Sequence, residues 1–401
     1  MREALLLLAA LVLSGCASHS GAPDSPFQIL TRDHLPDQAA SPADQGVLRV
    51  MTYNVAGLPA PVRSGRKAAL AEIGDRLAGL REAGEAPQIV FLQEAFMDEA
   101  TQTLIRRAGY AFAVRGPDKS HAPAPRLGAL GAPRRARGEG LGKLTGSGLY
   151  ILSDYPILDV RAMTFGDCAG LDCLANKGVL MARIQTPFAP EPVEVFTTHL
   201  NARKASKAPI KRAHLAHQLQ MTTLKAFLAK SLRPGAPLVY GGDFNMRRST
   251  VRLDHAAPAA PYAFARAVCQ TDGARCDLTE LEPEERTVLS TQDLQGFREG
   301  DGLTIRPVRL KTFWSEFGPA ALSDHSAYTV DYRLERRDRP RLILTGLMDP
   351  ENGEVFMRRG PQATQRADNA GAEEQLLSGL IAASYPAPSP ARSLSRQYAA
   401  N

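Results

Sequence analysis

Five short segments place metal-binding and proton-transferring side chains directly beside runs of strand-forming residues. They are Tyr53-Asn54-Val55, Phe91-Leu92-Gln93-Glu94, Phe196-Thr197-Thr198-His199-Leu200, Tyr240-Gly241-Gly242-Asp243-Phe244-Asn245 and Leu322-Ser323-Asp324-His325. If the strands end side by side, their polar groups converge on one edge of a sheet. The acidic and amide oxygens favour Mg²⁺, or another divalent cation such as Mn²⁺ or Co²⁺, over zinc.

Two of these segments contribute a histidine, which adds acid–base chemistry to the expected metal site. Two imidazoles beside such an ion suit the hydrolysis of a phosphate ester. The adjacency of Asp324 and His325 does not by itself make them a pair in space. A Ser-His-Asp hydrolase would require a Gly-x-Ser-x-Gly turn, which the sequence lacks, and there is no GxGxxG or Walker motif.

The elements that must position these groups are read from hydrophobic periodicity. Strands are expected over residues 47–53, 88–92, 148–152, 179–184, 193–198 and 238–240. A helix is expected from Arg66 to Ala83, with Leu70, Ile73, Leu77 and Leu80 on one face. A second is expected from His214 to Lys230, with a buried stripe of Leu215, Leu219, Leu224 and Leu228. Strict alternation of strand and helix is absent, which favours an α+β or sandwich architecture over a Rossmann sheet.

The composition excludes several broad classes of protein. The chain has 401 residues, of which 44% are hydrophobic and 22% charged, unlike a disordered tail, a disulfide miniprotein or a multipass membrane protein. The 48 basic and 42 acidic residues give a net charge of +6. This balance suits a phosphate-bearing partner, either nucleic acid or membrane, although a solvated surface is the plainer interpretation.

The N-terminal residues predict export and lipidation. The apolar run from Ala4 to Leu13 is about half the length of a membrane-spanning helix and is typical of a secretory signal. It ends in Leu13-Ser14-Gly15-Cys16, which resembles a bacterial lipobox; an ordinary signal peptide is the alternative. We expect cleavage before Cys16 and acylation of its thiol. Because Ala17 follows, inner-membrane retention is not signalled, so we expect a lipid anchor in the cell envelope, at the outer membrane or cell surface.

The rest of the chain divides by composition. The predicted parts are a signal over 1–15, a flexible tether over 16–45, a catalytic domain over 46–335 and a partly disordered extension over 336–401. Within the extension, residues 340–360 are expected to form a small hairpin. The Gly- and Pro-rich stretch 116–146 is expected to be a long mobile loop, and its Arg134, Arg135 and Arg137 to be solvated.

Four cysteines remain if Cys16 is lipidated. They are Cys168, Cys173, Cys269 and Cys276. An even number in an oxidising compartment favours two disulfides, and the sequence leaves all three pairings open. The spacing fits no zinc-binding pattern.

Taken in order from about residue 47 to 334, the five segments resemble the endonuclease/exonuclease/phosphatase superfamily, which has the DNase I-like fold. The resemblance implies an α+β protein built as a four-layer α/β sandwich, in which two packed β-sheets are flanked by helices. It covers most of the predicted mature chain. Any one segment is a weak signal, and the order of all five carries the resemblance.

A narrower resemblance is to the bacterial neutral sphingomyelinases (sphingomyelinase C). These carry a Cys-Gly-x-Asp…Asn-Lys-Gly pattern, which the segment from Phe165 to Val179 resembles, except that Ala169 precedes Gly170. The segment Thr198-His199-Leu200-Asn201-Ala202 is also similar to theirs. Phe313-Trp314 falls where those enzymes carry an exposed, membrane-entering aromatic pair, although Trp314 could equally be a core residue.

The superfamily implies roles for the oxygen-bearing residues. Glu94 would bind the metal directly, Asn54 would be a ligand or lie close to it, and Asp324 would bind it or lie beside it. Asp243 would orient the attacking water or hold a metal-bound one. Asn245 would donate to a non-bridging oxygen as charge builds there.

The two histidines would handle protons. His325 would be the general base that takes a proton from water, and His199 would protonate the leaving alkoxide or stabilise the phosphoryl oxygens. A carboxylate that supports the base is also expected. Asp293 is the candidate, although the following Gln295-Gly296 departs from the usual apolar strand.

The first functional hypothesis is therefore a monomeric, metal-dependent phosphodiesterase that cleaves membrane sphingomyelin to ceramide and phosphocholine. An extracytoplasmic Mg²⁺-dependent endonuclease is the main alternative, since the same fold and metal serve nucleases and the net charge suits DNA. Other phosphate esters, and a non-catalytic surface-binding lipoprotein, are further alternatives. No residues for choline binding can be identified from the sequence, in which aromatic residues are only 6%.

Overall fold

The computed structural model describes residues 29–31, 46–189, 191–259, 263–271, 276–315, 321–337, 345–348 and 355–358. The predicted signal, Cys16, nearly all of the tether and most of the C-terminal extension lie outside these residues. The predicted boundaries at 46 and 335 stay predictions.

One sheet has seven strands. Their order is β1 (Ile29–Thr31), β4 (Phe112–Arg115), β5 (Tyr150–Ser153), β3 (Ile89–Gln93), β2 (Val47–Asn54), β13 (Ala327–Arg336) and β12 (Leu303–Phe313). The neighbours β2 and β3 run parallel, so their carboxyl ends reach the same edge of the sheet.

The other sheet has six strands and contains a second parallel pair. Their order is β10 (Ala263–Phe264), β11 (Asp293–Arg298), β9 (Leu238–Asp243), β8 (Val193–His199), β7 (Gly178–Ile184) and β6 (Ile157–Thr164). The parallel neighbours are β8 and β9, and their last residues are two of the candidate site residues.

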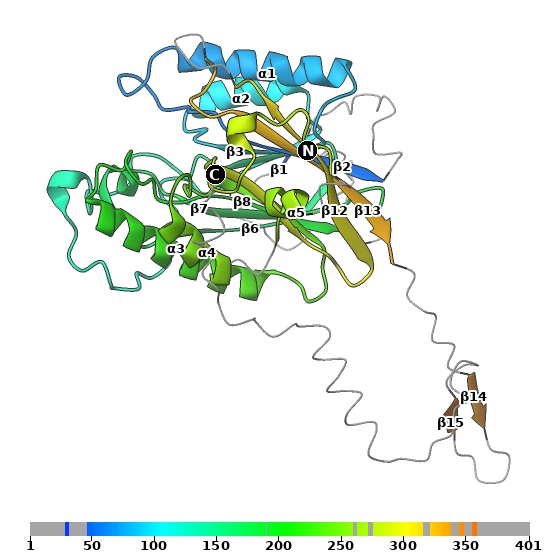
Figure 1. Cartoon of the computed structure of the whole chain (residues 1–401). Helices are drawn as coiled ribbons and strands as arrows, with labels where there is room; N and C mark the ends of the chain where they lie inside the picture. Colours follow the sequence, from blue (N-terminus) through cyan, green and yellow to red (C-terminus); the bar gives the residue numbers. More distant parts are fainter. Residues whose placement is uncertain are drawn as a thin grey trace, which may run out of the picture.

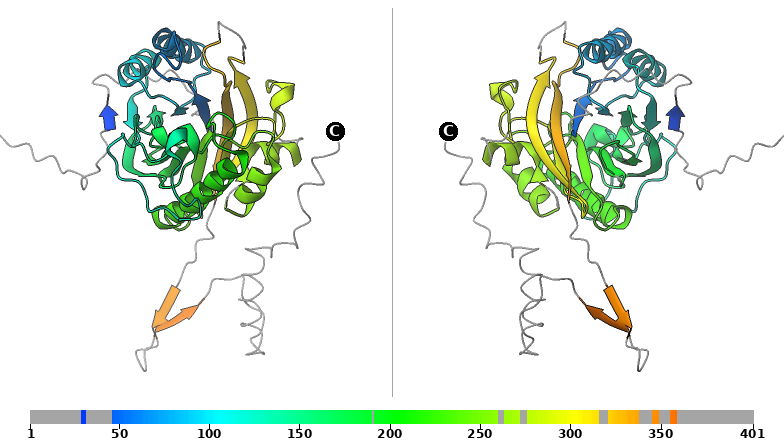
Figure 2. Two further views of the ribbon diagram at one scale, coloured as in Figure 1. Left: turned by 90° about the vertical axis from the view of Figure 1, so that its left-hand side faces the viewer. Right: turned by 90° about the vertical axis from the view of Figure 1, so that its right-hand side faces the viewer.

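Helices cover the outer faces of both sheets (Figure 1). The first sheet is covered by α1 (Arg66–Glu82) and α2 (Asp98–Ala108), and the second by α3 (Ile210–Ser231) and α4 (Thr250–Ala259). Figure 2 shows the same layering from two further sides. A fifth helix, α5 (Ala265–Thr271), follows β10, and three 3₁₀ turns are η2 (Arg135–Arg137), η3 (Gly170–Leu174) and η4 (Pro283–Glu285).

The side-chain alternation of β2 shows why the layers form. Leu48 and Val50 point into the core between the sheets, whereas Met51 and Tyr53 point into the core beneath α1 and α2. Successive residues of a strand face opposite sides, so a strand that is apolar throughout must be buried on both. This arrangement confirms the expected α+β sandwich of two packed sheets flanked by helices.

The main elements begin and end close to their expected positions, with a few differences. The helix expected from His214 begins earlier, at Ile210. Leu224 and Leu228 are buried as expected, while Leu215 and Leu219 are only partly buried, since they pack on a smaller cluster. In α1 the predicted face is buried except for Leu80, which is partly exposed near the helix end.

The strand β11 is not predicted from the sequence, because it contains polar and small residues. Gln295 is buried and its amide donates to the carbonyls of Val50 and Tyr328, 3.0 Å away in each case, which ties the two sheets together. Gly296 lies against the Tyr240 ring, where a Cβ atom would clash. Each residue therefore satisfies a packing requirement that an apolar residue would not.

The stretch 116–146 is irregular, as expected, but it is anchored. The buried Asn176 amide donates to the carbonyls of Asp118 and His121, both at 2.9 Å. The buried Glu139 carboxylate bonds Arg212 of α3 at 2.6 Å. These contacts make it an anchored loop rather than the mobile loop that its composition predicts, because each bond fixes the backbone beside it.

The four cysteines form two local disulfides, Cys168–Cys173 and Cys269–Cys276, which selects one of the three possible pairings. The expected C-terminal hairpin is present as β14 (Thr345–Met348) paired with β15 (Val355–Arg358). A search of the described residues for a helix long and apolar enough to cross a bilayer finds none.

Candidate active site

The two parallel strand pairs bring four candidate residues to one edge of the sandwich. Asn54 ends β2 and pairs in register with Gln93, the residue before Glu94. His199 ends β8 and lies opposite Asp243, the last residue of β9. Because parallel strands end on the same side, each sheet presents its polar termini at this edge.

Asp243 is the centre of the cluster. Its Oδ2 lies 3.1 Å from Asn54 Nδ2, 3.3 Å from His199 Nε2 and 4.0 Å from His325 Nε2. The same Asn54 nitrogen donates to Glu94 Oε1 at 3.2 Å. Residues from five separate segments of the chain therefore meet around one carboxylate oxygen.

Asp243 is a buried carboxylate with two other carboxylates close to it. Burial, reinforced by the carboxylates of Asp293 and Glu94, raises the pKa of Asp243 to about 7, although His325 and Lys177 oppose this shift. Buried carboxylates this close resist ionising together unless a cation compensates them. The cluster therefore has an unmet demand for positive charge.

His325 is held by a carboxylate, as the resemblance implies. Its Nδ1 lies 2.6 Å from Asp293 Oδ2, and its Nε2 lies 3.3 Å from the amide nitrogen of Gln292. Burial alone would lower the pKa of His325, but Asp293 first, and Asp243 and Asp324 after it, raise that pKa to about 10. Asp293 thus fixes the ring and stabilises its protonated form.

His199 has the opposite environment. Its Nε2 lies 2.8 Å from the Nζ atom of Lys177, whose ammonium is also paired with Asp172 at 2.8 Å. Burial, with the positive charges of Lys177 and His325, holds the pKa of His199 well below its usual value. We assign the neutral ring, with Nε2 accepting from Lys177. The buried Nδ1 has no hydrogen-bond partner within the described residues.

The two asparagines are held by the backbone. Asn54 accepts the N–H of Ala56 at 3.0 Å through Oδ1, so its amide nitrogen, rather than its oxygen, faces the carboxylates. In this orientation Asn54 positions Glu94 and Asp243. The amide of Asn245 donates to the carbonyl of Leu200 at 3.0 Å, which places Asn245 beside the cluster.

Asp324 is the one predicted metal residue that lies apart from the carboxylate cluster. It forms an ion pair with Arg63 at 2.8 Å, and 60% of its side chain is exposed. Partial burial opposes its ionisation, but the hydrogen bond from Arg63 and the charge of His325 keep the pKa of Asp324 below its usual value. Although it precedes His325 in sequence, the structure pairs it with a different residue.

The resemblance implies a divalent cation, and the donors present fit one. The ligand atoms of Glu94, His199 and Asp243 lie within 4.8 Å of one another, and so do those of Asp243, Asp293 and His325. The hard carboxylate oxygens and the unmet negative charge at Asp243 suit such an ion. Glu94 and Asp243 are the ligands that this geometry offers most directly.

Three positioning residues escaped the sequence analysis. The side-chain amide of Gln292 contacts Nε2 of His325, and Nζ of Lys177 contacts Nε2 of His199. In the sequence, Lys177 is only a member of the Asn-Lys-Gly pattern. The buried guanidinium of Arg66 donates to the carbonyls of Val55, Ala56 and Leu322, which joins the ends of two catalytic segments. The one sequence signal for Arg66 is a basic residue in the first turn of a predicted helix, where acidic residues are favoured.

A cavity of about 180 Å³ adjoins His325. Five carboxylates line it together with His325, the guanidinium of Arg247 and several neutral polar side chains; the carboxylates are those of Glu282, Glu284, Glu285, Asp293 and Asp324. Trp314 does not protrude as the resemblance implies. Its ring is partly buried against Tyr53, with centroids 5.4 Å apart, and Phe313 packs beside it.

The sequence of the chain matches a known protein family. The model of the Endonuclease/Exonuclease/phosphatase family matches residues 51–325, so the chain belongs to this family. A curated relative is the sphingomyelinase of Mycobacterium tuberculosis, which is 25% identical over 314 residues, covering 72% of this chain and 53% of the relative. The chain thus spans about half the length of the curated relatives it matches.

Solved structures similar to this chain include a sphingomyelinase and a protein bound to DNA. Sphingomyelinase C from Streptomyces griseocarneus has a TM-score of 0.48 and 21% identity, covering 71% of this chain and 99% of that one. TDP2 of D. rerio, complexed with a single-strand DNA product, has a TM-score of 0.46 and 16% identity, covering 71% and 98%.

Proposed function

We propose that this protein is a monomeric, divalent-cation-dependent phosphodiesterase that hydrolyses sphingomyelin to ceramide and phosphocholine. The observation that carries this choice is the acidic cavity beside His325. Walls formed by Glu282, Glu284 and Glu285 attract a quaternary ammonium group and repel the phosphates of a nucleic acid. The similarity to a sphingomyelinase over most of the chain gives independent support.

His325 is suited to be the base. With Nδ1 held by Asp293, its Nε2 is the nitrogen left to take a proton from the attacking water, and Asp293 then stabilises the imidazolium. A divalent cation held by Glu94 and Asp243 would offset charge on the phosphate and leaving oxygen, and would lower the pKa of His325 by repulsion.

His199 and Lys177 are suited to the leaving group. The ring is neutral and the ammonium charged, so the pair carries one positive charge rather than two. As the bond from phosphorus to the ceramide oxygen breaks, the alkoxide takes a proton from this pair. Because a neutral ring that lost its own proton would become an imidazolate, the proton is the one on the Lys177 ammonium, which becomes a neutral amine while His199 keeps it oriented through their 2.8 Å contact.

An assay of the purified protein tests the reaction. With Mg²⁺, we expect phosphocholine release from sphingomyelin, and we expect EDTA to abolish it and added Mg²⁺ or Mn²⁺ to restore it. Phosphatidylcholine and plasmid DNA are offered in parallel. Nicking of DNA without phosphocholine release would establish the alternative, a Mg²⁺-dependent endonuclease, which the exposed arginines at 134, 135 and 137 favour.

The acidic cavity has its own test. Glu282→Gln combined with Glu284→Gln should raise KM for sphingomyelin while leaving turnover of a phosphodiester without a cationic group unchanged. Glu72→Gln, on the surface of α1, is the matched control. An unchanged KM in the double variant would remove the cavity from substrate recognition.

We also propose that the protein is anchored in the bacterial envelope through acylated Cys16. The lipobox-like residues before Cys16 support this localisation. Metabolic labelling with a fatty acid should mark the wild type and leave Cys16→Ser unlabelled. Equal labelling of both would contradict the proposal.

A further inference from the structure

One face of the molecule combines protruding aliphatic side chains with unpaired positive charges. It is called the leucine–arginine face here, and its members come from the loop 116–146, from η3 and from the segment 203–211. The aliphatic members are Leu127, Leu141, Leu144, Leu171 and Ile210, and the basic members are Arg134, Arg135, Arg137, Lys204, Lys207 and Lys211.

The aliphatic members are unusually exposed. Of the eight large hydrophobic side chains exposed in the described part of the chain, five belong to this face, with exposures between 46% and 66%. The other three are Val62, Leu158 and Val251. Exposed apolar groups that gather on one face, with polar groups around them, are typical of an interaction surface.

Backbone contacts hold the three segments side by side. The N–H of Leu171 donates to the carbonyl of Ser206 at 2.7 Å, and the guanidinium of Arg137 donates to the carbonyl of Lys207 at 2.7 Å. The N–H of Leu144 donates to the carbonyl of Leu174 at 2.7 Å. The members therefore form one continuous face rather than three unrelated loops.

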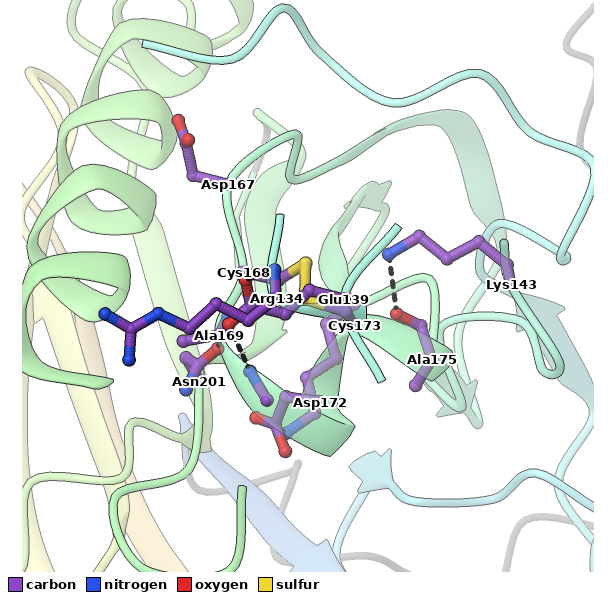
Figure 3. Close-up of a disulfide and its surroundings, with 12 residues drawn as sticks. Arg134, Glu139, Lys143, Asp167, Cys168, Ala169, Asp172, Cys173, Ala175 and Asn201 are labelled. Atoms are coloured by element: carbon purple, nitrogen blue, oxygen red, sulfur yellow. Dashed lines mark hydrogen bonds and ion pairs between the residues drawn. A yellow bond between two sulfur atoms is a disulfide. The ribbon is translucent and has the colours of Figure 1, made fainter. Parts of the chain in front are cut away.

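A buried carboxylate fastens this face to the fold. Glu139 accepts two bonds from Arg212, at 2.6 and 2.8 Å, and also the N–H groups of Gly170 and Arg134. Figure 3 shows Glu139 and Arg134 near the Cys168–Cys173 disulfide, at the loop that carries Asp172. The face is thus preorganised, which lowers the entropic cost of binding a partner.

The charges of this face are not compensated. Among the described residues, none of its six basic side chains forms an ion pair, although Arg137 donates to a carbonyl. Between residues 119 and 153 the only acidic residue is Glu139, and between 195 and 253 it is Asp243. Both of these carboxylates are buried, so the exposed charges of the two stretches are positive, and Asp172 of η3 is paired with Lys177.

We propose that the leucine–arginine face docks on an anionic phospholipid surface. Leucines reach the headgroup and acyl boundary, while arginines and lysines pair with lipid phosphates. Protruding leucines favour a lipid surface over nucleic acid, whose backbone offers them no apolar partner. The docking goes beyond the proposed reaction and does not depend on its substrate.

Docking at this face would bring lipid close to the catalytic groups. Leu171 directly precedes Asp172, which pairs with Lys177, which in turn contacts His199. A bilayer that contacts Leu171 is therefore connected to His199, on the leaving-group side of the site, through Asp172 and Lys177.

Vesicle sedimentation in EDTA tests the docking without turnover. The vesicles contain phosphatidylcholine alone or mixed with phosphatidylglycerol, with no sphingomyelin, and every full-length chain carries Cys16→Ser so that acylation contributes nothing. One variant changes Leu127, Leu141 and Leu144 to Glu, and another changes Arg135, Lys207 and Lys211 to Glu. The matched controls are Leu158→Glu, and Lys225, Lys230 and Arg306 all changed to Glu, which are exposed elsewhere.

We expect the wild type to bind the anionic vesicles selectively, and about 500 mM salt to release it. Each face variant should bind at least about tenfold more weakly, while both controls bind like the wild type. Thermal unfolding checks that the variants are folded; if one is not, Leu144→Glu alone replaces it. Unchanged binding by the variants, or equal binding to both vesicles, overturns the proposal. Binding of plasmid DNA is measured in parallel by gel retention. If the face variants lose plasmid binding but keep vesicle binding, the face binds nucleic acid instead.

Discussion

The two histidines of the candidate site are both largely buried, yet their surroundings shift their pKa values in opposite directions. His325 faces the carboxylate of Asp293, which raises its pKa to about 10. His199 faces the ammonium of Lys177, and its pKa is held well below the usual value. One sheet edge thus carries a ring that gains a proton readily and a ring that resists one.

The charge of the nearest partner, and not burial, distinguishes the two rings. Burial opposes the charge on both rings, but a carboxylate 2.6 Å from His325 outweighs it, while an ammonium 2.8 Å from His199 adds to it. Pairs of titratable groups whose environments separate their pKa values are typical of acid–base sites.

Removing the more basic ring should have the largest effect. His325→Ala should lower kcat by about 10³-fold, because nothing else at the site can take the proton from water. Phosphocholine release measures this, with His121→Ala as the control and thermal unfolding as the check on the fold. Retained turnover would end the assignment of His325 as base.

Removing the partner of that ring should have the next largest effect. Asp293→Asn should lower kcat by about 10²-fold and move the acidic limb of the pH profile, where activity rises as His325 loses its proton, to lower pH. The sign follows because Asp293 raises the pKa of His325 and only the neutral ring can act as base. Kinetics across pH test this, with Asp254→Asn on α4 as the control. A limb that stays in place would contradict the coupling.

Removing Lys177, the partner of His199, should have a smaller effect on activity. Lys177→Met should raise the pKa of His199, since one of the positive charges that depress it is gone, although burial keeps the pKa low. We expect kcat to fall by about tenfold, because Lys177 no longer supplies the proton. NMR titration of His199 measures the shift. Lys177→Arg keeps the charge, so a similar shift in that variant would count against the explanation.

The smallest effect is expected at Asp324, which belongs to neither partnership. Its ion pair with Arg63 is exposed, so Asp324→Asn should change stability by less than about 1 kcal/mol and activity by only a few fold. Calorimetric titration with Mn²⁺ should give unchanged affinity, whereas Glu94→Gln should lose it. Loss of Mn²⁺ binding in Asp324→Asn would restore Asp324 to the metal site.

Much of the architecture followed from local pattern. The apolar runs at 47–53 and 193–198 lie in β2 and β8, because residues that are buried on both faces leave no other assignment. The missed helix α2 also has local signals, namely Asp98 and Glu99 in its first turn and Gly109 at its end. The residues that follow each strand could therefore be identified before any contact was known.

The electrostatic partners could not be identified in this way. Asp293 reaches His325 because β11 pairs with β9, which sets Asp293 opposite Asp243. Lys177 reaches His199 across 22 positions of sequence, while Asp324, adjacent to His325, turns to Arg63. Because strand patterns are local, the sequence predicted which chemical groups lie at the ends of the strands. Only the tertiary structure decided which group faces which, because register and sheet packing set distances of a few ångströms, on which a pKa depends.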